Sequence, residues 1–115
     1  MKLRIKGNSV RLRLTQSEVD SIGSGNSVEE STDFAGKTLK YRLLVAEDYG
    51  ARFEDYTISI NLKEEVIQSW LKPEEVSIRF DVGNTGYLVE KDFACLITRD
   101  GEDDADTFPN PLAKI

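Results

Sequence analysis

The chain of 115 residues contains no histidine and a single cysteine. Without histidine there is neither a Ser-His nor a Cys-His catalytic pair, and the imidazole ligands of most zinc and non-haem iron sites are missing. The lone cysteine, Cys95, cannot form a disulfide within the chain or a cysteine cluster for a metal. These absences favour a non-enzymatic protein that works without a cofactor.

Long apolar runs are also missing. No stretch approaches the roughly 20 residues of a membrane helix, and residues 1–6 alternate instead of forming a signal-peptide core. We therefore expect a cytoplasmic protein without a membrane partner. A length of 115 residues with 39% hydrophobic and 31% charged residues suits one folded domain. We expect a domain over residues 1–99 and an acidic, proline-containing tail over residues 100–115.

Alternation of apolar and charged residues predicts several strands. Residues 2–6 and 9–14 alternate cleanly, and Gly7-Asn8 between them is either a hairpin turn or a bulge in one long strand. Residues 27–34 are polar and favour an edge strand. Further strands are predicted over residues 38–46, 51–62, 76–82 and 87–91, with residues 93–98 extending or following the last one.

Two short helices are predicted. Thr15 and Glu18 form a capping box, and we expect Gly23 to end the first helix in the left-handed conformation. A second helix over residues 63–71 ends before Pro73. The apolar positions of the two helices each lie on one helical face, and they are Val19 and Ile22 in the first helix and Val66, Ile67, Trp70 and Leu71 in the second.

These elements predict an α+β fold, with a mostly antiparallel sheet or partly closed barrel of about six to eight strands and two short helices. An offset of 48 residues aligns the two halves without a gap, each with strand, helix, strand and strand. The match is either the alternation that any two β-rich halves share or a true internal repeat. A repeat would relate the helices by a pseudo-twofold axis and leave room for a groove between the halves.

Charge is distributed unevenly along the chain. The segment before residue 15 carries five cations and no acid, whereas the remainder carries 10 cations and 21 acids. The five cations either bind an anion or form a solvated sheet face that protects an edge from aggregation. The net charge of −6 and the absence of stacking aromatics in this segment argue against a nucleic-acid partner. The candidate anion-binding residues are Lys2, Arg4, Lys6, Arg11 and Arg13.

Two further groups of residues are candidates for chemistry. Cys95 could act as a thiolate beside Lys91, but a cysteine between Ala and Leu is more typical of buried packing. Separately, Glu90 and Asp92 could serve as an acid–base pair. An acidic run near the end is a weak metal candidate without EF-hand spacing, and the alternatives are a solvated tail or a tail that docks on the basic strands. That run contains Asp100, Glu102, Asp103, Asp104 and Asp106.

Three functional interpretations follow. The first is a binding or protein-interaction module whose partner is an unknown protein or a second copy. The second is an anion- or phosphate-binding protein that uses the basic N-terminal strands. The third is an enzyme that depends on carboxylates or Cys95 in a groove between the halves.

The sequence also resembles a family of short uncharacterised bacterial proteins. Residues 2–14 (KLRIKGNSVRLRL) resemble the opening of that family, and residues 89–96 (VEKDFACL) and 108–111 (FPNP) resemble its later blocks. The likeness spans nearly the whole chain. The resemblance implies a bacterial cytoplasmic protein of unknown function, and it identifies no functional residue.

Overall fold

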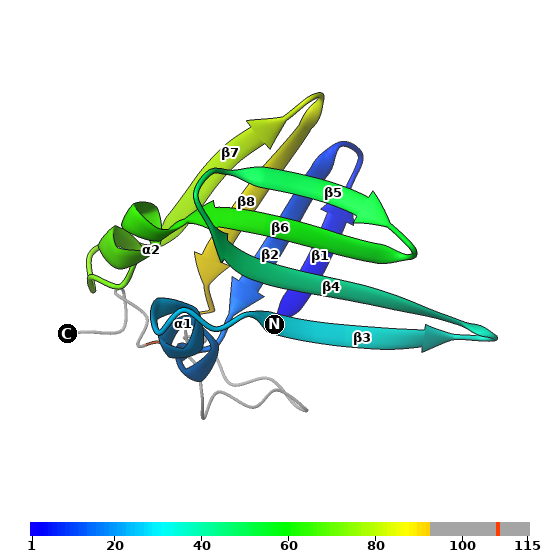
Figure 1. The fold of residues 1–115 in the computed structure, drawn as a ribbon, viewed down its shortest axis with the longest axis horizontal. Coiled ribbons are helices and arrows are strands. Elements are labelled where there is room, and N and C mark those ends of the chain that lie inside the picture. The colour runs from blue at the N-terminus through cyan, green and yellow to red at the C-terminus, as the bar shows by residue number, and fades with distance from the viewer. Residues whose placement is uncertain (93–107, 109–115) are drawn as a thin grey trace, which may run out of the picture.

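A computed structural model describes residues 1–92 and Phe108. Within these residues the chain forms eight strands and two helices, which confirms the α+β class (Figure 1). The elements, in chain order, are β1 (Lys2–Lys6), β2 (Ser9–Leu14), α1 (Gln16–Gly23), β3 (Val28–Phe34), β4 (Lys37–Ala46), β5 (Gly50–Glu54), β6 (Thr57–Lys63), α2 (Glu64–Trp70), β7 (Ser77–Val82) and β8 (Thr85–Lys91).

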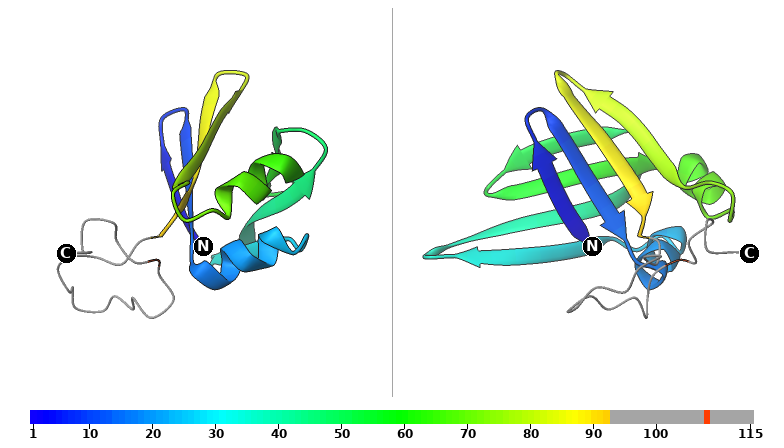
Figure 2. Two further views of the ribbon diagram at one scale, coloured as in Figure 1. Left: turned by 90° about the vertical axis from the view of Figure 1, so that its left-hand side faces the viewer. Right: turned by 180° about the vertical axis from the view of Figure 1, so that it is seen from behind.

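The strands form two four-stranded sheets and not one closed barrel. Sheet A has the order β1-β2-β8-β7, and sheet B has the order β3-β4-β6-β5. Each sheet contains two antiparallel hairpins that meet at a parallel pair, β2 with β8 and β4 with β6. The two sheets face each other, and both helices lie at the same end of the sheet pair (Figures 1 and 2).

The element pattern repeats at the 48-residue offset. The bounds of β1 shifted by 48 are those of β5, and the β3–β4 hairpin turn corresponds to the β7–β8 turn. Each sheet combines the first hairpin of one half with the second hairpin of the other. The register of the two parallel pairs differs by two residues. Ser9 pairs with Gly86, whose counterpart is Thr38, but Thr57, the counterpart of Ser9, pairs with Lys40. A slip of two keeps every side chain on its own face. Common ancestry of the halves stays a prediction.

The start of α1 follows the sequence rule. Thr15 Oγ1 accepts from the amide of Glu18, and Glu18 Oε1 accepts from the amide of Thr15 at 2.9 Å, which completes the capping box. The predicted helix end was wrong by two residues. Gly23 is still helical, and the residue with positive φ is Gly25, at 90°. Gly23 instead lets the Leu71 side chain approach closely, because a Cβ there would lie 2.9 Å from its methyl groups.

The prediction of one strand over residues 51–62 was wrong. The chain folds there into the β5–β6 hairpin around Asp55 and Tyr56, which both have positive φ, 50° and 57°. Two-residue hairpin turns of this kind favour Asn and Gly, so Asp-Tyr gave no turn signal. Neighbouring groups hold the turn: Lys37 Nζ donates to the Tyr56 hydroxyl at 2.6 Å, and the Lys40 amide donates to the Tyr56 carbonyl at 2.9 Å.

The core lies between the inner faces of the sheets and under the helices. Trp70 is 1% exposed, and its indole N–H donates to the Val76 carbonyl at 3.1 Å. Of the predicted helix faces, Val66 and Leu71 are half-buried while the other four residues are buried. The predicted strand over residues 93–98 and the predicted tail over residues 100–115 lie outside the described residues, apart from Phe108. The fully buried large side chains are Leu12, Leu14, Ile22, Leu43, Ile60, Leu62, Ile67, Trp70 and Val89.

Candidate functional site

The five N-terminal cations share the outer face of sheet A. The antiparallel register places Lys2 opposite Arg13, Arg4 opposite Arg11, and Lys6 opposite Ser9. Their apolar neighbours in the strands point inward, where Leu12 and Leu14 are fully buried. We call these five residues, Lys2, Arg4, Lys6, Arg11 and Arg13, the basic face.

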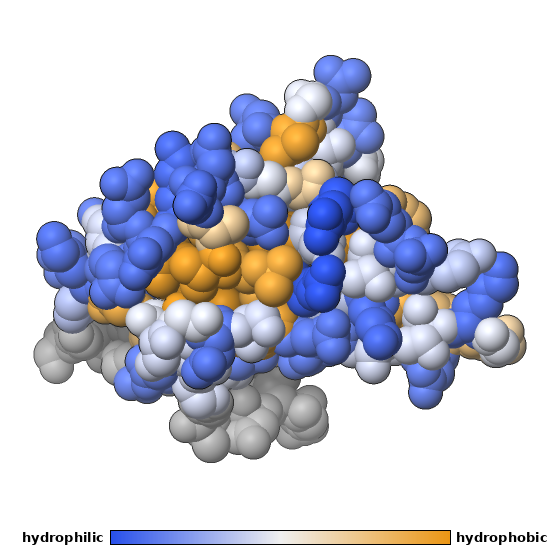
Figure 3. All heavy atoms as spheres, in the orientation of Figure 1, coloured by the Kyte–Doolittle hydropathy of each residue, from blue (hydrophilic) through white to orange (hydrophobic). Residues whose placement is uncertain are grey.

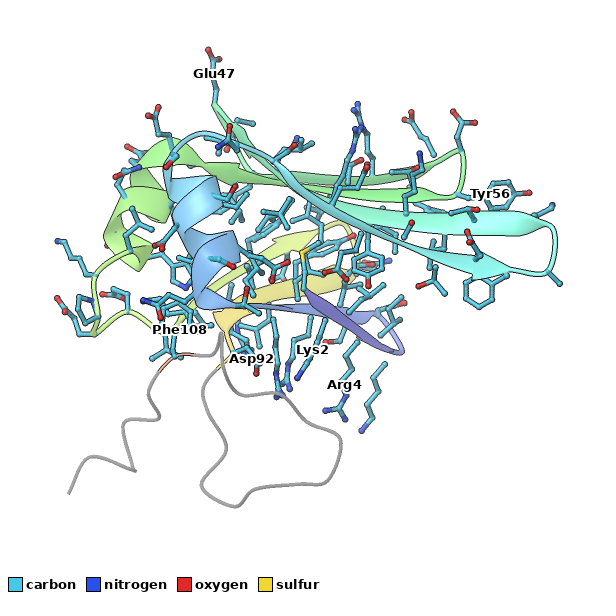
Figure 4. The ribbon with its side chains drawn as sticks, turned by 90° about the horizontal axis from the view of Figure 1, so that it is seen from below. Lys2, Arg4, Glu47, Tyr56, Asp92 and Phe108 are labelled. Atoms are coloured by element: carbon cyan, nitrogen blue, oxygen red, sulfur yellow. The ribbon has the colours of Figure 1, made fainter. Side chains whose placement is uncertain are left out.

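Four of the five line one small cavity. Its volume is about 170 Å³, and its lining consists of Lys2, Arg4, Arg11 and Arg13. Figure 4 shows Lys2 and Arg4 projecting from β1 on the same side of the sheet, with Asp92 beside Lys2. Sequence reasoning brought these residues together correctly, because period-two alternation assigns them to one face. Lys6 belongs to the same face but does not line the cavity.

Two carboxylates from the end of β8 neutralise part of this charge. Glu90 contacts Arg13 at 2.7 Å and Arg11 at 3.6 Å, and Asp92 contacts Lys2 at 3.2 Å. Within residues 1–92, neither Arg4 nor Lys6 has a carboxylate within salt-bridge distance. The cavity is therefore an electropositive site, and two carboxylates that do not line it contact the cations at one end.

Sheet B provides an internal comparison. The positions that correspond to Lys2, Arg4, Arg11 and Arg13 in the second half are Gly50, Arg52, Ser59 and Asn61. The cavity over the outer face of sheet B has about 190 Å³ and a lining of mixed charge. Sheet B thus forms with only one of the four cations, Arg52. The lining of that cavity is Glu29, Lys40, Arg42, Arg52, Glu54, Asp55, Thr57 and Ser59.

One cation on this face was missed from the sequence. Arg79 of β7 pairs with Leu88, which pairs in turn with Arg11, so the three share the outer face of sheet A. Arg79 lines a separate cavity of about 440 Å³ together with Lys63 and Glu65. The sequence did contain a signal, because alternation with the buried residues Ile78 and Phe80 predicts that Arg79 points outward. Only the pairing of β2 with β8 brings it to this sheet.

The structure separates the predicted reactive residues. Glu90 and Asp92 contact the basic face, whereas Lys91 is buried and donates to the Lys72 carbonyl at 2.9 Å. Burial lowers the pKa of Lys91, and the charges of Glu74 and Glu75 oppose that shift only in part. Cys95 lies outside the described residues. An acid–base role of Glu90 with Asp92 stays a prediction.

The acidic run of residues 100, 102, 103, 104 and 106 also lies outside the described residues, so the metal and docking hypotheses stay predictions. Among residues 1–92 and Phe108, no three His, Cys, Asp or Glu residues are grouped as metal ligands. In the same part of the chain, no helix has the length and apolar character needed to cross a bilayer.

A charged cluster that sequence reasoning did not find surrounds the first residue. The α-ammonium of Met1 donates to Glu18 Oε2 at 2.7 Å and to Glu30 Oε1 at 2.6 Å, and the Tyr41 hydroxyl donates to Glu30 Oε2 at 3.1 Å. Burial by itself would lower the pKa of the ammonium, but the hydrogen bonds and charges of the two glutamates outweigh it and raise the pKa. Burial and the charge of Glu30 raise the pKa of Tyr41. The cluster ties β1 to α1 and β3.

Apolar surface is present away from the basic face. Figure 3 shows an apolar area between α1 and α2, bordered by hydrophilic side chains. Beside the end of β4, a cavity of about 480 Å³ has Val45 and Ala46 in its lining together with acidic residues of α2. Exposed aromatic rings occur on sheet B, where Phe34 is 58% and Phe53 is 64% exposed.

A family model matches residues 1–112 of the chain and is described as a family of unknown function, DUF7009. The chain belongs to this family. Membership of DUF7009 confirms the expected uncharacterised family and assigns no activity. Neither curated proteins nor solved structures gave a significant match. The site in this DUF7009 member must therefore be interpreted from its own geometry.

Proposed function

We propose that this protein binds small multivalent anions on the basic face of sheet A. The observation that carries the proposal is the cavity lined by four cations, Lys2, Arg4, Arg11 and Arg13. Anion binding was the second of the three interpretations of the sequence. A cytoplasmic location remains part of the proposal and rests on the sequence alone.

The arrangement of the cations is unfavourable in the absence of an anion. Arg4 lies directly opposite Arg11, and Lys2 lies directly opposite Arg13. Cβ atoms of directly opposite residues are only about 4.5–5.5 Å apart, and like charges in such pairs destabilise a sheet. Glu90 and Asp92 offset the charges of Lys2, Arg11 and Arg13, but Arg4 gains no such partner. A bound anion would relieve this repulsion.

Edge protection explains only part of the pattern. Charged residues on an edge strand block edge-to-edge aggregation, and β1 is an edge of sheet A. β2, however, lies inside the sheet between β1 and β8. Arg11 and Arg13 therefore protect no edge, and the equivalent residues of sheet B are Ser59 and Asn61. Their placement beside Arg4 supports ligand binding.

The test is calorimetric titration of the full chain with inorganic pyrophosphate at low salt. The double variant Arg4→Gln with Arg11→Gln should bind at least about tenfold more weakly, because a hydrogen bond to a charged group contributes about 1.5–3 kcal/mol. The matched control is Arg52→Gln with Lys40→Gln, which removes the same charge from the outer face of sheet B. Equal affinities of the two double variants, or no binding by the unmodified chain, would refute the proposal.

Self-association is a second candidate, favoured by the exposure of Phe34 and Phe53 on sheet B. They lie on the two edge strands of sheet B, β3 and β5, and are the most exposed aromatic side chains among the described residues. Light scattering across a range of protein concentrations tests it. A concentration-dependent dimer that Phe34→Ser with Phe53→Ser abolishes would support it, and a monomer at all concentrations would exclude it.

A further inference from the structure

We propose that the anion bound on the basic face is a compact dianion, the phosphoryl group of a phosphate monoester, and not a chain of phosphodiesters. This inference rests on the function proposed above. It concerns the size, charge and shape of the group that fits between Arg4 and Arg11.

The four cations form a compact grid. Lys2 faces Arg13 and Arg4 faces Arg11, so the cavity is two residues wide and two residues long. Opposite residues are about 5 Å apart, and alternate residues along a strand are about 7 Å apart. The grid surrounds a single point, where one tetrahedral group can contact several side chains at once. Lys6, the one cation that would lengthen the row, does not line the cavity.

The residual charge matches a dianion. Four cations line the cavity, and two carboxylates, Glu90 and Asp92, contact three of them. Four cations and two carboxylates leave a net charge of +2 at the cavity. A phosphate monoester carries about −1.5 to −2 charges at pH 7, with a second pKa near 6. A phosphodiester carries one.

The flanking carboxylates disfavour a linear polyanion. Glu90 and Asp92 contact Arg13 and Lys2 at one end of the cavity without lining it, and a phosphate chain that continued past this end would approach the two carboxylates. The cavity of about 170 Å³ is also below the roughly 300–1,000 Å³ of pockets that enclose whole small molecules. It is large enough for one charged end group, with the rest of the ligand outside.

The side-chain chemistry is that of phosphoryl recognition. Three of the four cations are arginines, whose planar guanidinium groups donate two parallel hydrogen bonds to phosphate oxygens. Arg4 is exposed and has no carboxylate partner within the described residues, so we assign it the first contact with the phosphoryl group. Arg11, held only loosely by Glu90 at 3.6 Å, supplies the second.

The experiment compares phenyl phosphate, dimethyl phosphate and sulfate by calorimetry between pH 5 and pH 7. Phenyl phosphate should bind at least about tenfold more tightly than dimethyl phosphate at pH 7. Its affinity should fall about tenfold at pH 5, since its second pKa lies near 6. The groups facing the site are the basic face, Arg79, Glu90 and Asp92, and the chain has no histidine. Sulfate, a dianion throughout, reports any titration of the protein itself.

Variants of the counter-charge complete the test. Glu90→Gln should tighten phenyl phosphate binding several-fold, whereas Glu54→Gln on the outer face of sheet B should leave it unchanged. Equal binding of dimethyl phosphate, or an oligonucleotide that outcompetes phenyl phosphate at equal phosphate concentration, would overturn the inference but keep anion binding. No binding of any anion, pyrophosphate included, would overturn both.

Discussion

Replacement of Trp70 by alanine is expected to destabilise the protein more than most single changes. The side chain belongs to α2, is 1% exposed and is the only tryptophan in the chain. Removing a buried aromatic ring costs about 3–5 kcal/mol, because transfer free energy is lost and a cavity remains. At about 4 °C or more per kcal/mol for a domain of this size, the melting temperature should fall by at least about 12 °C.

The hydrogen bond of Trp70 contributes little to that cost. The Val76 carbonyl accepts from the indole N–H at 3.1 Å and also from the Lys91 amide at 3.1 Å. It keeps a partner when the indole is removed, so no buried acceptor is left unsatisfied. Trp70→Phe should therefore be much milder than Trp70→Ala, and the difference between the two variants measures the packing of the ring.

The assay is urea unfolding followed by circular dichroism, since the fluorescence of the only tryptophan disappears with the mutation. Ile22→Ala is a matched comparison, because Ile22 is the equivalent residue of α1 and is also 1% exposed. Ser69→Ala, an exposed neighbour, is the control and should change stability by less than about 0.5 kcal/mol. A loss below about 1 kcal/mol for Trp70→Ala would refute the assignment of α2 to the core.

Two predictions concern the dependence of stability on pH. The pKa of the Met1 ammonium is raised in the folded state, so its stabilisation is complete below about pH 8 and disappears as the pH rises through the folded-state pKa. Glu30→Gln should lower the free energy of unfolding at pH 7 by up to about 1 kcal/mol and reduce its fall between pH 7 and pH 9.5. Urea titrations at the two pH values measure that fall, and an equal fall in the variant and the unmodified chain would contradict the prediction. The pKa of Lys91 is lowered by burial, which means that the folded state binds its proton less readily than the unfolded state, and its contribution to stability rises with pH toward about 10.4. Lys91→Met should stabilise the protein at pH 7 and remove that rise, because the equivalent residue Leu43 is fully buried without a charge. A variant less stable than the unmodified chain at pH 7 would refute this prediction. It would show that the contacts of the ammonium with the Lys72 carbonyl and the Phe108 ring outweigh the cost of its burial.

Local sequence determined the individual elements. Alternation specified which side chains of β1 and β2 face outward, since side chains in a strand point to opposite faces in turn. The capping box at Thr15 specified the start of α1, because each side chain satisfies the other's backbone amide. Alternation also identified the cation-rich face of β1 and β2 from the sequence. The turn at Asp55 and Tyr56 could not, because its positive φ angles depend on contacts with Lys37 and Lys40 of another hairpin.

Only the tertiary structure decided how the hairpins combine. Sheet A joins β2 to β8 across 77 positions of the chain, since Ser9 pairs with Gly86, and no local pattern encodes a partner so distant. That pairing brings Glu90 to Arg11 and Arg13, and it carries Asp92 to Lys2. Sequence alone therefore determined that the cations share a face. The fold decided their counter-charges and the cavity, because these depend on strand neighbours and not on alternation.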